Sequence, residues 1–109
     1  MRDFVYVKDV TNWIAELMDK KPGNGIYNMG FGKPRTWLEL ARSIFSSMQI
    51  DMKINWLEMP ENIRGQYQYY TEAKTVKWLA AGMTPSKWPL EKAVTDYVQN
   101  YLSKEDPSI

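Results

Sequence analysis

Apolar residues recur at the spacing of amphipathic helices along this chain, and no other feature of the sequence constrains its fold as strongly. The first such stretch ends at Lys20-Lys21 and is broken by Pro22-Gly23, which is typical of a helix end. In the second, Thr36 and Glu39 have the spacing of a capping box, which predicts a helix start. The apolar positions of the first helix are Val10, Trp13, Ile14, Leu17 and Met18, and those of the second are Trp37, Leu40, Ala41, Ile44, Phe45 and Met48.

Two further helices are predicted in the C-terminal half. Thr71 is a candidate cap for a helix that continues through Ala81 and stops at Gly82. Pro89 lies at the start of the last helix, where its fixed φ and missing N–H are tolerated. The apolar positions of that helix are Leu90, Ala93, Val94, Tyr97, Val98, Tyr101 and Leu102.

Short β-branched and aromatic runs predict strands between these helices. They fall at residues 3–7, 26–29 and 52–57, while residues 66–70 form an aromatic-rich extended stretch and residues 60–65 a loop. The first two strands and the helix between them make a βαβ-like unit. No internal repeat or low-complexity linker divides the chain, so we expect a single α/β domain of the mixed α+β kind.

The composition excludes several classes of function. Lys and Arg number 14 against 13 Asp and Glu, a formal net charge of +1, which is far from the positive field of a nucleic-acid-binding protein. Without cysteine or histidine, the 109 residues cannot form a disulfide, a common zinc site or a serine–histidine triad. No apolar run approaches the roughly 18 residues of a membrane helix, and the first residues lack the apolar stretch of a secretory signal. We therefore expect a cytoplasmic protein that binds neither nucleic acid nor membrane.

The glycine-rich segment Gly30-Phe31-Gly32-Lys33 lies between a predicted strand and a predicted helix, where glycine loops bind phosphates. Its spacing does not support that function. A P-loop requires glycine at the position of Tyr27, and a dinucleotide-binding loop requires glycine where Arg35 stands.

A second candidate is the group of Arg64, Tyr67, Tyr69 and Tyr70 around Gly65. In one interpretation the guanidinium pairs with a diphosphate and a ring stacks on a base. In the other, the tyrosines belong to a half-buried strand and the arginine is a solvated loop charge. The residues alone favour the second interpretation.

The remaining polar and aromatic residues do not by themselves indicate a catalytic or binding function. Arg2-Asp3 is either a phosphate clamp with a supporting carboxylate or a polar terminus, and by itself the pair favours the terminus. Most of the five tryptophans fall at positions that helix or strand spacing assigns to packing. Among the carboxylates, Glu58 and Glu61 flank a proline loop, and Glu72 falls in the predicted first turn of a helix, where the dipole favours it. No acid–base pair is evident.

Two segments, residues 2–10 (RDFVYVKDV) and residues 25–32 (GIYNMGFG), show a resemblance to one known superfamily. In order and at the expected separation, they resemble the late strand-to-helix segment and the late strand and loop of extended short-chain dehydrogenase/reductases, the superfamily of nucleotide-sugar epimerases and dehydratases. Within the superfamily, residues 63–73 (IRGQYQYYTEA) and 79–82 (LAAG) resemble the ADP-glyceromanno-heptose 6-epimerases. The resemblance covers nearly the whole chain.

The resemblance implies that residues 1–103 are the C-terminal substrate-binding region of an NADP-dependent isomerase, with residues 104–109 as a tail and the Rossmann domain largely absent. Enzymes of this family oxidise the side-chain carbinol of an ADP-linked heptose and return the hydride to the opposite face. Their product feeds lipopolysaccharide inner-core synthesis. The family's NADP-binding loop and catalytic tyrosine and lysines lie upstream of the matching segment. We therefore expect no catalytic residue, cofactor-binding residue or metal ligand here, and no activity from this chain alone.

Two substrate-binding positions carry over from the family. Arg2 opens the Arg-Asp-Phe motif, and Tyr67 is the tyrosine of the Gly-x-Tyr-Gln motif. Both are expected to contact the ADP-sugar, since arginine suits the diphosphate charge and tyrosine offers a ring face and a hydroxyl. Two departures leave the sugar open: Phe31 replaces a small hydroxyl residue, and Lys74 stands where aspartate is common.

Two alternative functions stay open. A UDP-sugar epimerase or dehydratase of the same superfamily would prefer a uridine ligand, and a non-catalytic module would bind a nucleotide sugar or a partner without turnover. The exposed helix face and strand edges of the βαβ-like unit also predict self-association, so we expect a homo-oligomer.

Overall fold

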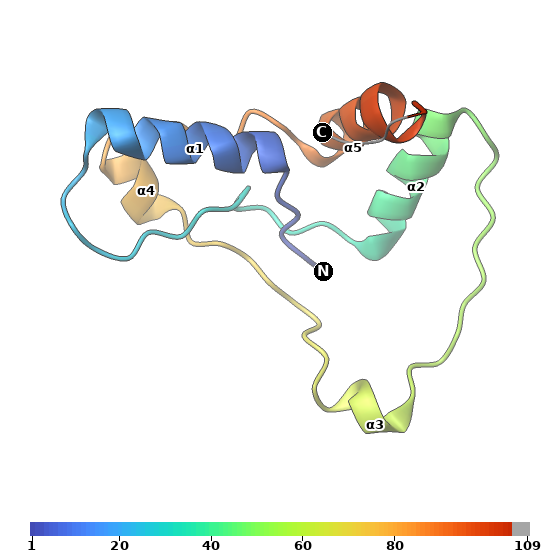
Figure 1. Ribbon diagram of the computed structural model, residues 1–109. Coiled ribbons are helices and arrows are strands. Elements are labelled where there is room, and N and C mark those ends of the chain that lie inside the picture. The colour runs from blue at the N-terminus through green and yellow to red at the C-terminus, as the bar shows by residue number, and fades with distance from the viewer. Residues whose placement is uncertain (106–109) are drawn as a thin grey trace.

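The computed structural model describes residues 1–105, in which helices are the only regular elements apart from one isolated β-bridge (Figure 1). The strands predicted at residues 3–7, 26–29 and 52–57 are therefore wrong for this part of the chain, and so is the βαβ-like unit built from them. A strand is stable only where a neighbouring segment pairs with its backbone groups. Within the described residues no segment supplies such a ladder, so the predicted α/β class reduces to a helical arrangement.

The helix α1 (Val7–Lys20) is the amphipathic helix that the apolar spacing predicts. Its end is also as predicted. Lys21 adopts a left-handed conformation with φ 47° and donates its N–H to the carbonyl oxygen of Leu17 at 3.1 Å, and Pro22 follows.

The first packing centre lies between α1 and α4 (Val76–Ala80), at one end of the molecule in Figure 1. Trp13 and Trp78 meet edge to face with centroids 6.0 Å apart, and each ring is 2% exposed. Both indole N–H groups donate to the carbonyl oxygen of Thr84, at 3.0 and 2.8 Å, so the buried polar atoms are satisfied. The neighbours packed against this centre are Val10, Leu17, Tyr27, Met29 and Met83.

The helix α4 is shorter than predicted. It begins at Val76, although its end before Gly82, whose φ is 79°, agrees with the prediction. The hydroxyl of Thr71 does not cap a helix, because it accepts a hydrogen bond from the N–H of Asp3 at 3.0 Å. The hydroxyl oxygen that the sequence pattern assigned to a helix cap is therefore used in a tertiary hydrogen bond.

The start of α2 (Trp37–Met48) carries the predicted capping box. The Thr36 hydroxyl accepts from the N–H of Glu39 at 3.0 Å, and the Glu39 carboxylate accepts from the N–H of Thr36 at 3.1 Å.

The second packing centre joins α2 to the C-terminal helix, which consists of α5 (Leu90–Tyr97) and a π-helical segment, η1 (Val98–Leu102). The small side chains of Ser47 and Thr95 face each other across this contact, with their hydroxyls 3.1 Å apart. Residues 106–109 of the predicted tail lie outside the described residues.

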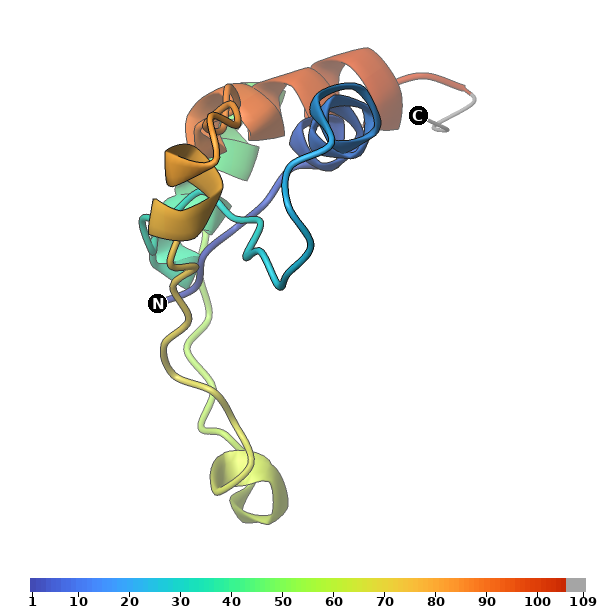
Figure 2. The same ribbon diagram turned by 90° about the vertical axis from the view of Figure 1, so that its left-hand side faces the viewer.

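Residues 49–75 extend from these two centres as a long arm, with α3 (Glu61–Arg64) at its tip (Figure 1, Figure 2). The loop predicted at residues 60–65 therefore contains a single helical turn. Trp56 and Leu57 on the arm are 80% and 90% exposed. The radius of gyration is 16.7 Å, whereas a compact chain of this length has about 13 Å. The arm gives the molecule its open shape.

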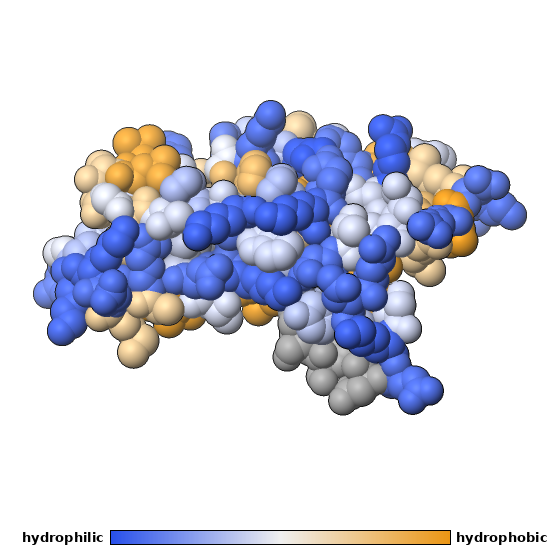
Figure 3. All heavy atoms as spheres, turned by 90° about the horizontal axis from the view of Figure 1, so that it is seen from above, coloured by the Kyte–Doolittle hydropathy of each residue, from blue (hydrophilic) through white to orange (hydrophobic). Residues whose placement is uncertain are grey.

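The face formed by α1 and α5 is polar along its middle, while hydrophobic side chains gather toward its edges (Figure 3). No helix within residues 1–105 has both the length and the hydropathy to cross a bilayer.

Candidate functional site

The two substrate-binding residues predicted from the sequence, Arg2 and Tyr67, lie together in the structure. The guanidinium carbon of Arg2 stands 5.5 Å from the centroid of the Tyr67 ring, which is the distance of a cation–π contact. The same guanidinium donates from Nη1 to Oε1 of Gln68 at 3.1 Å. Two consecutive residues of the arm therefore hold Arg2, one by a ring face and one by an amide.

Trp37 completes this site, although the sequence analysis assigned it to packing. Its Nε1 donates to the hydroxyl oxygen of Tyr67 at 2.7 Å, and its ring meets Phe4 edge to face at 5.2 Å. The indole is 50% exposed. Its position in the apolar pattern of α2 gave no signal of this contact, because the partner lies 30 residues away on the arm. Tyr69 packs on the Tyr67 ring at 5.1 Å.

The positive charge of Arg2 has no carboxylate partner within residues 1–105, since none of the ion pairs there includes it. Its Nε is enclosed by protein and has no acceptor in the same range. An enclosed donor without a partner costs about 1–3 kcal/mol. Arg2 is held in place at a cost to stability, which is typical of functional sites.

Arg35, the neighbour of Arg2 across the isolated β-bridge, forms ion pairs with carboxylates, whereas Arg2 forms none within residues 1–105. Arg2 and Arg35 exchange backbone hydrogen bonds of 2.8 and 2.7 Å. Arg35 also pairs with Glu39 and Glu91, and these hydrogen bonds raise the pKa of Arg35 and lower the pKa of both carboxyl groups. Of the two adjacent arginines, one is neutralised by the protein and the other faces aromatic and amide groups.

Asp3 connects the site to the glycine loop. Its Oδ1 accepts from the N–H of Phe31 at 2.9 Å, and its Oδ2 accepts from the N–H groups of Gly32 at 2.9 Å and Ala73 at 2.8 Å. The loop that resembled a phosphate cradle thus directs its N–H groups to an internal carboxylate. The N–H groups of Phe31 and Gly32 are therefore engaged by Asp3. Asp3 thus joins three segments of the chain, so it is not part of a solvated polar terminus.

The predicted group around Gly65 divides in the structure. Tyr67 and Tyr69 lie at the site, whereas Arg64 lies in α3 at the tip of the arm and donates from Nη2 to the carbonyl oxygen of Met59 at 3.1 Å. Tyr70 donates to Glu72 at 2.7 Å, and this hydrogen bond raises the pKa of Tyr70. Glu72 precedes α4, so its predicted place in the first turn of a helix is wrong.

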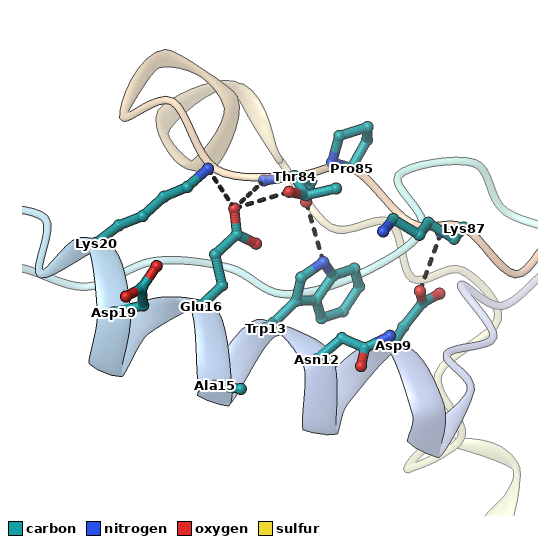
Figure 4. Close-up of a pocket in the computed structure, with 10 residues that line it drawn as sticks. All are labelled: Asp9, Asn12, Trp13, Ala15, Glu16, Asp19, Lys20, Thr84, Pro85 and Lys87. Carbon is teal, nitrogen blue, oxygen red and sulfur yellow. Dashed lines mark hydrogen bonds and ion pairs between the residues drawn. The ribbon is translucent and has the colours of Figure 1, made fainter.

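A separate groove of about 460 Å³ lies between α1 and residues 84–87 (Figure 4). Its polar groups bind one another: Oε1 of Glu16 accepts from Nζ of Lys20 at 2.7 Å and from the N–H of Thr84 at 2.9 Å. These bonds, led by that from Lys20, lower the pKa of Glu16. At the other end, Oδ1 of Asp9 accepts from the N–H of Lys87 at 2.9 Å. The hydrogen bonds along this groove therefore attach residues 84–87 to α1. Nowhere in residues 1–105 do three or more acidic side chains gather as a metal site.

Comparison with known proteins identifies relatives along the whole chain, although no protein-family model matches it. The ADP-L-glycero-D-manno-heptose-6-epimerase of Nitratidesulfovibrio vulgaris strain Hildenborough is 41% identical over 109 residues, which are 100% of this chain and 34% of that protein. The protein of the same name from Fusobacterium nucleatum subsp. nucleatum is 43% identical over 112 residues, covering 97% of this chain and 34% of that protein.

The chain therefore spans about a third of the length of the curated relatives it matches. At 41–43% identity, the chain is homologous to these epimerases. It corresponds to the C-terminal portion of the ADP-L-glycero-D-manno-heptose-6-epimerases, which confirms the resemblance seen in the sequence.

Proposed function

We propose that this chain is the part of an ADP-L-glycero-D-manno-heptose 6-epimerase that binds the nucleotide-sugar substrate. The observation that carries the proposal is the contact between the Tyr67 ring and the Arg2 guanidinium, which forms no ion pair within residues 1–105, in a chain homologous to these enzymes along its whole length. Arg2 supplies paired N–H donors and a fixed positive charge for the diphosphate. Tyr67 supplies a ring and a hydroxyl beside it.

The complete enzyme, in this proposal, is an NADP-dependent isomerase of the extended short-chain dehydrogenase/reductase superfamily. It works in the cytoplasm as a homo-oligomer, and its product enters lipopolysaccharide core synthesis. NADP supplies the hydride chemistry when bound, and the residues of this chain bind and orient the sugar nucleotide. The 109 residues contain no dinucleotide-binding glycine loop and no histidine. We therefore expect the chain alone to bind substrate weakly without NADP binding or turnover.

The test is a titration of the ¹⁵N-labelled chain with ADP-L-glycero-D-manno-heptose, followed by NMR. We expect Arg2→Ala and Tyr67→Ala each to raise the Kd about 5- to 150-fold, the equivalent of about 1–3 kcal/mol. Matched controls are Arg42→Ala on the exposed side of α2 and Tyr97→Phe on α5, which should leave the Kd unchanged. Equal affinity of the wild type and both site variants would contradict the proposal. Tighter binding of UDP-glucose than of the ADP-sugar would favour a different epimerase or dehydratase.

A further inference from the structure

We infer that Trp37 is a positioning residue for substrate binding, because its indole N–H makes the Tyr67 hydroxyl a hydrogen-bond donor toward an anionic oxygen of the ligand. The inference rests on the proposed function and deepens it. It assigns the Tyr67 hydroxyl to the diphosphate rather than to the base or the sugar, and it adds a residue that no sequence pattern indicated.

The chemistry follows from one short contact. An indole N–H is only a donor, whereas a tyrosine hydroxyl both donates and accepts. The Nε1 of Trp37 lies 2.7 Å from the hydroxyl oxygen of Tyr67, so this oxygen accepts and its own hydrogen points elsewhere. Within residues 1–105 the Tyr67 hydroxyl forms no other hydrogen bond. Its hydrogen is therefore available to an acceptor on a ligand.

The charge beside this hydroxyl decides which acceptor fits. The Arg2 guanidinium lies over the same tyrosine ring at 5.5 Å and has no carboxylate partner in the described residues. A cation and a donor on one residue pair select an oxyanion, since a charge-assisted hydrogen bond is stronger than a neutral one. In a nucleotide sugar the oxyanion is the diphosphate.

Trp37 is well placed to fix this geometry. It opens α2 directly after the Thr36 capping box, and Phe4 packs against its ring. Tyr67 lies on the arm. The indole hydrogen bond therefore joins the arm to a helix that is anchored in the second packing centre. With half of its surface exposed, Trp37 leaves the site open to a ligand.

The experiment separates the hydrogen bond from the ring. Trp37→Phe keeps a ring against Phe4 and removes the N–H, while Tyr67→Phe keeps the ring under Arg2 and removes the hydroxyl. The probes are ADP, inorganic diphosphate and adenosine, titrated into the ¹⁵N-labelled 109-residue chain. Trp56→Phe is the control, because this tryptophan lies on the arm, as Tyr67 does, and is 80% exposed. In the free chain, the Trp37 indole proton should shift upfield in Tyr67→Phe, which reports the hydrogen bond without ligand.

We expect each of the two site variants to weaken ADP and diphosphate binding about tenfold, the effect of losing one hydrogen bond to a charged group. The double variant should bind no more weakly than Tyr67→Phe alone, because Trp37 acts through that hydroxyl. Adenosine binding should not change. Trp56→Phe should match the wild type with every probe.

The inference is overturned if Trp37→Phe leaves ADP affinity unchanged while Arg2→Ala and Tyr67→Phe lower it, and the proposed function then stands. Additive losses in the double variant, or equal losses for adenosine and ADP, also overturn it, because Trp37 would then act through general structure. If no variant at Arg2 or Tyr67 changes ADP affinity, the proposed function fails as well.

Discussion

Gly30 meets the tightest packing of any glycine in the described part of the chain. A Cβ placed on Gly30 would lie 2.3 Å from the Cβ of Ala73 and 3.0 Å from Oδ2 of Asp3. Real side-chain atoms do not approach so closely, so only glycine fits. Because Asp3 follows Arg2 and binds the N–H of Ala73, this packing also fixes the base of the arm beside the site. A glycine of the predicted loop after residues 26–29 thus serves the geometry of Arg2.

Replacing this glycine tests that account. We expect Gly30→Ala to lower the free energy of unfolding by about 1–3 kcal/mol, because the added methyl must push Ala73 away. Ala73→Gly in the same chain should recover part of the loss, as measured by urea denaturation of both single variants and the double variant. The control is Gly23→Ala, where nothing lies within 4 Å of the added Cβ. A Gly30→Ala chain as stable as Gly23→Ala would refute the close packing.

At the scale of elements, an ionic contact joins the start of α1 to α5. Oδ2 of Asp96 accepts from Nζ of Lys8 at 2.7 Å and from the hydroxyl of Tyr6 at 2.7 Å. The Lys8 ammonium also lies 5.2 Å from the Trp88 ring and 5.0 Å from the Tyr101 ring. The hydrogen bonds from Lys8 and then Tyr6 lower the pKa of Asp96 to about 2. Burial, together with the bond to Asp96, raises the pKa of Tyr6.

This contact predicts a pH dependence of stability. The pKa of Asp96 is about 2 in the folded chain, whereas an ordinary aspartate, as in the unfolded chain, has a pKa of 3.8. Between these two pH values the unfolded chain therefore binds more protons than the folded chain. The contribution of Asp96 is therefore complete above pH 3.8, falls with the pH, and is lost near pH 2. Urea denaturation across this range should show wild type more stable than Asp96→Asn, with a difference that shrinks toward low pH. The control is Asp19→Asn, which removes a carboxylate at an exposed position of α1, outside this contact. A constant difference at every pH would exclude this linkage.

At the scale of the whole molecule, two small packing centres and an arm leave much apolar surface exposed. Ile14 and Met18 on α1 are 49% and 73% exposed, and Val76 on α4 is 78% exposed. The apolar face predicted for α1 is thus covered only in part, by the Trp13 and Trp78 centre. Ile14 and Met18 are four residues apart and so share one face of α1, and exposed apolar surface of this kind is typical of protein–protein contacts.

We expect the chain to self-associate, because burying each large apolar side chain is worth about 1.5–3 kcal/mol. Light scattering or sedimentation over a dilution series should show a monomer only at the lowest concentrations. Ile14→Lys and Met18→Lys should shift the equilibrium toward monomer, whereas Asn12→Lys, which adds the same charge at an exposed polar position of α1, should not. A monomer at every concentration would rule the association out.

The sequence by itself determined the elements whose information is local. The apolar spacing predicted α1, α2 and the C-terminal helix, and the capping box at Thr36 and Glu39 is present as written. These predictions are correct because helix hydrogen bonds and caps form between residues that are close in sequence. The relatedness to the ADP-heptose epimerases was also readable in the sequence. The roles of Arg2 and Tyr67 as substrate contacts stay predictions that the titrations test.

Only the tertiary structure decided the features that depend on partners distant in sequence. The runs predicted as strands stay unpaired within residues 1–105, because β-propensity does not supply the neighbour that a ladder needs. Thr71 bonds Asp3 instead of capping a helix, since a long-range donor took its hydroxyl. The sequence pattern predicts Trp37 only as an apolar helix residue. The fold places Tyr67 of the arm next to its indole N–H, where the two form a hydrogen bond. Sequence spacing reports short-range periodicity, and contacts across 30 residues or more are set by how the chain folds back on itself.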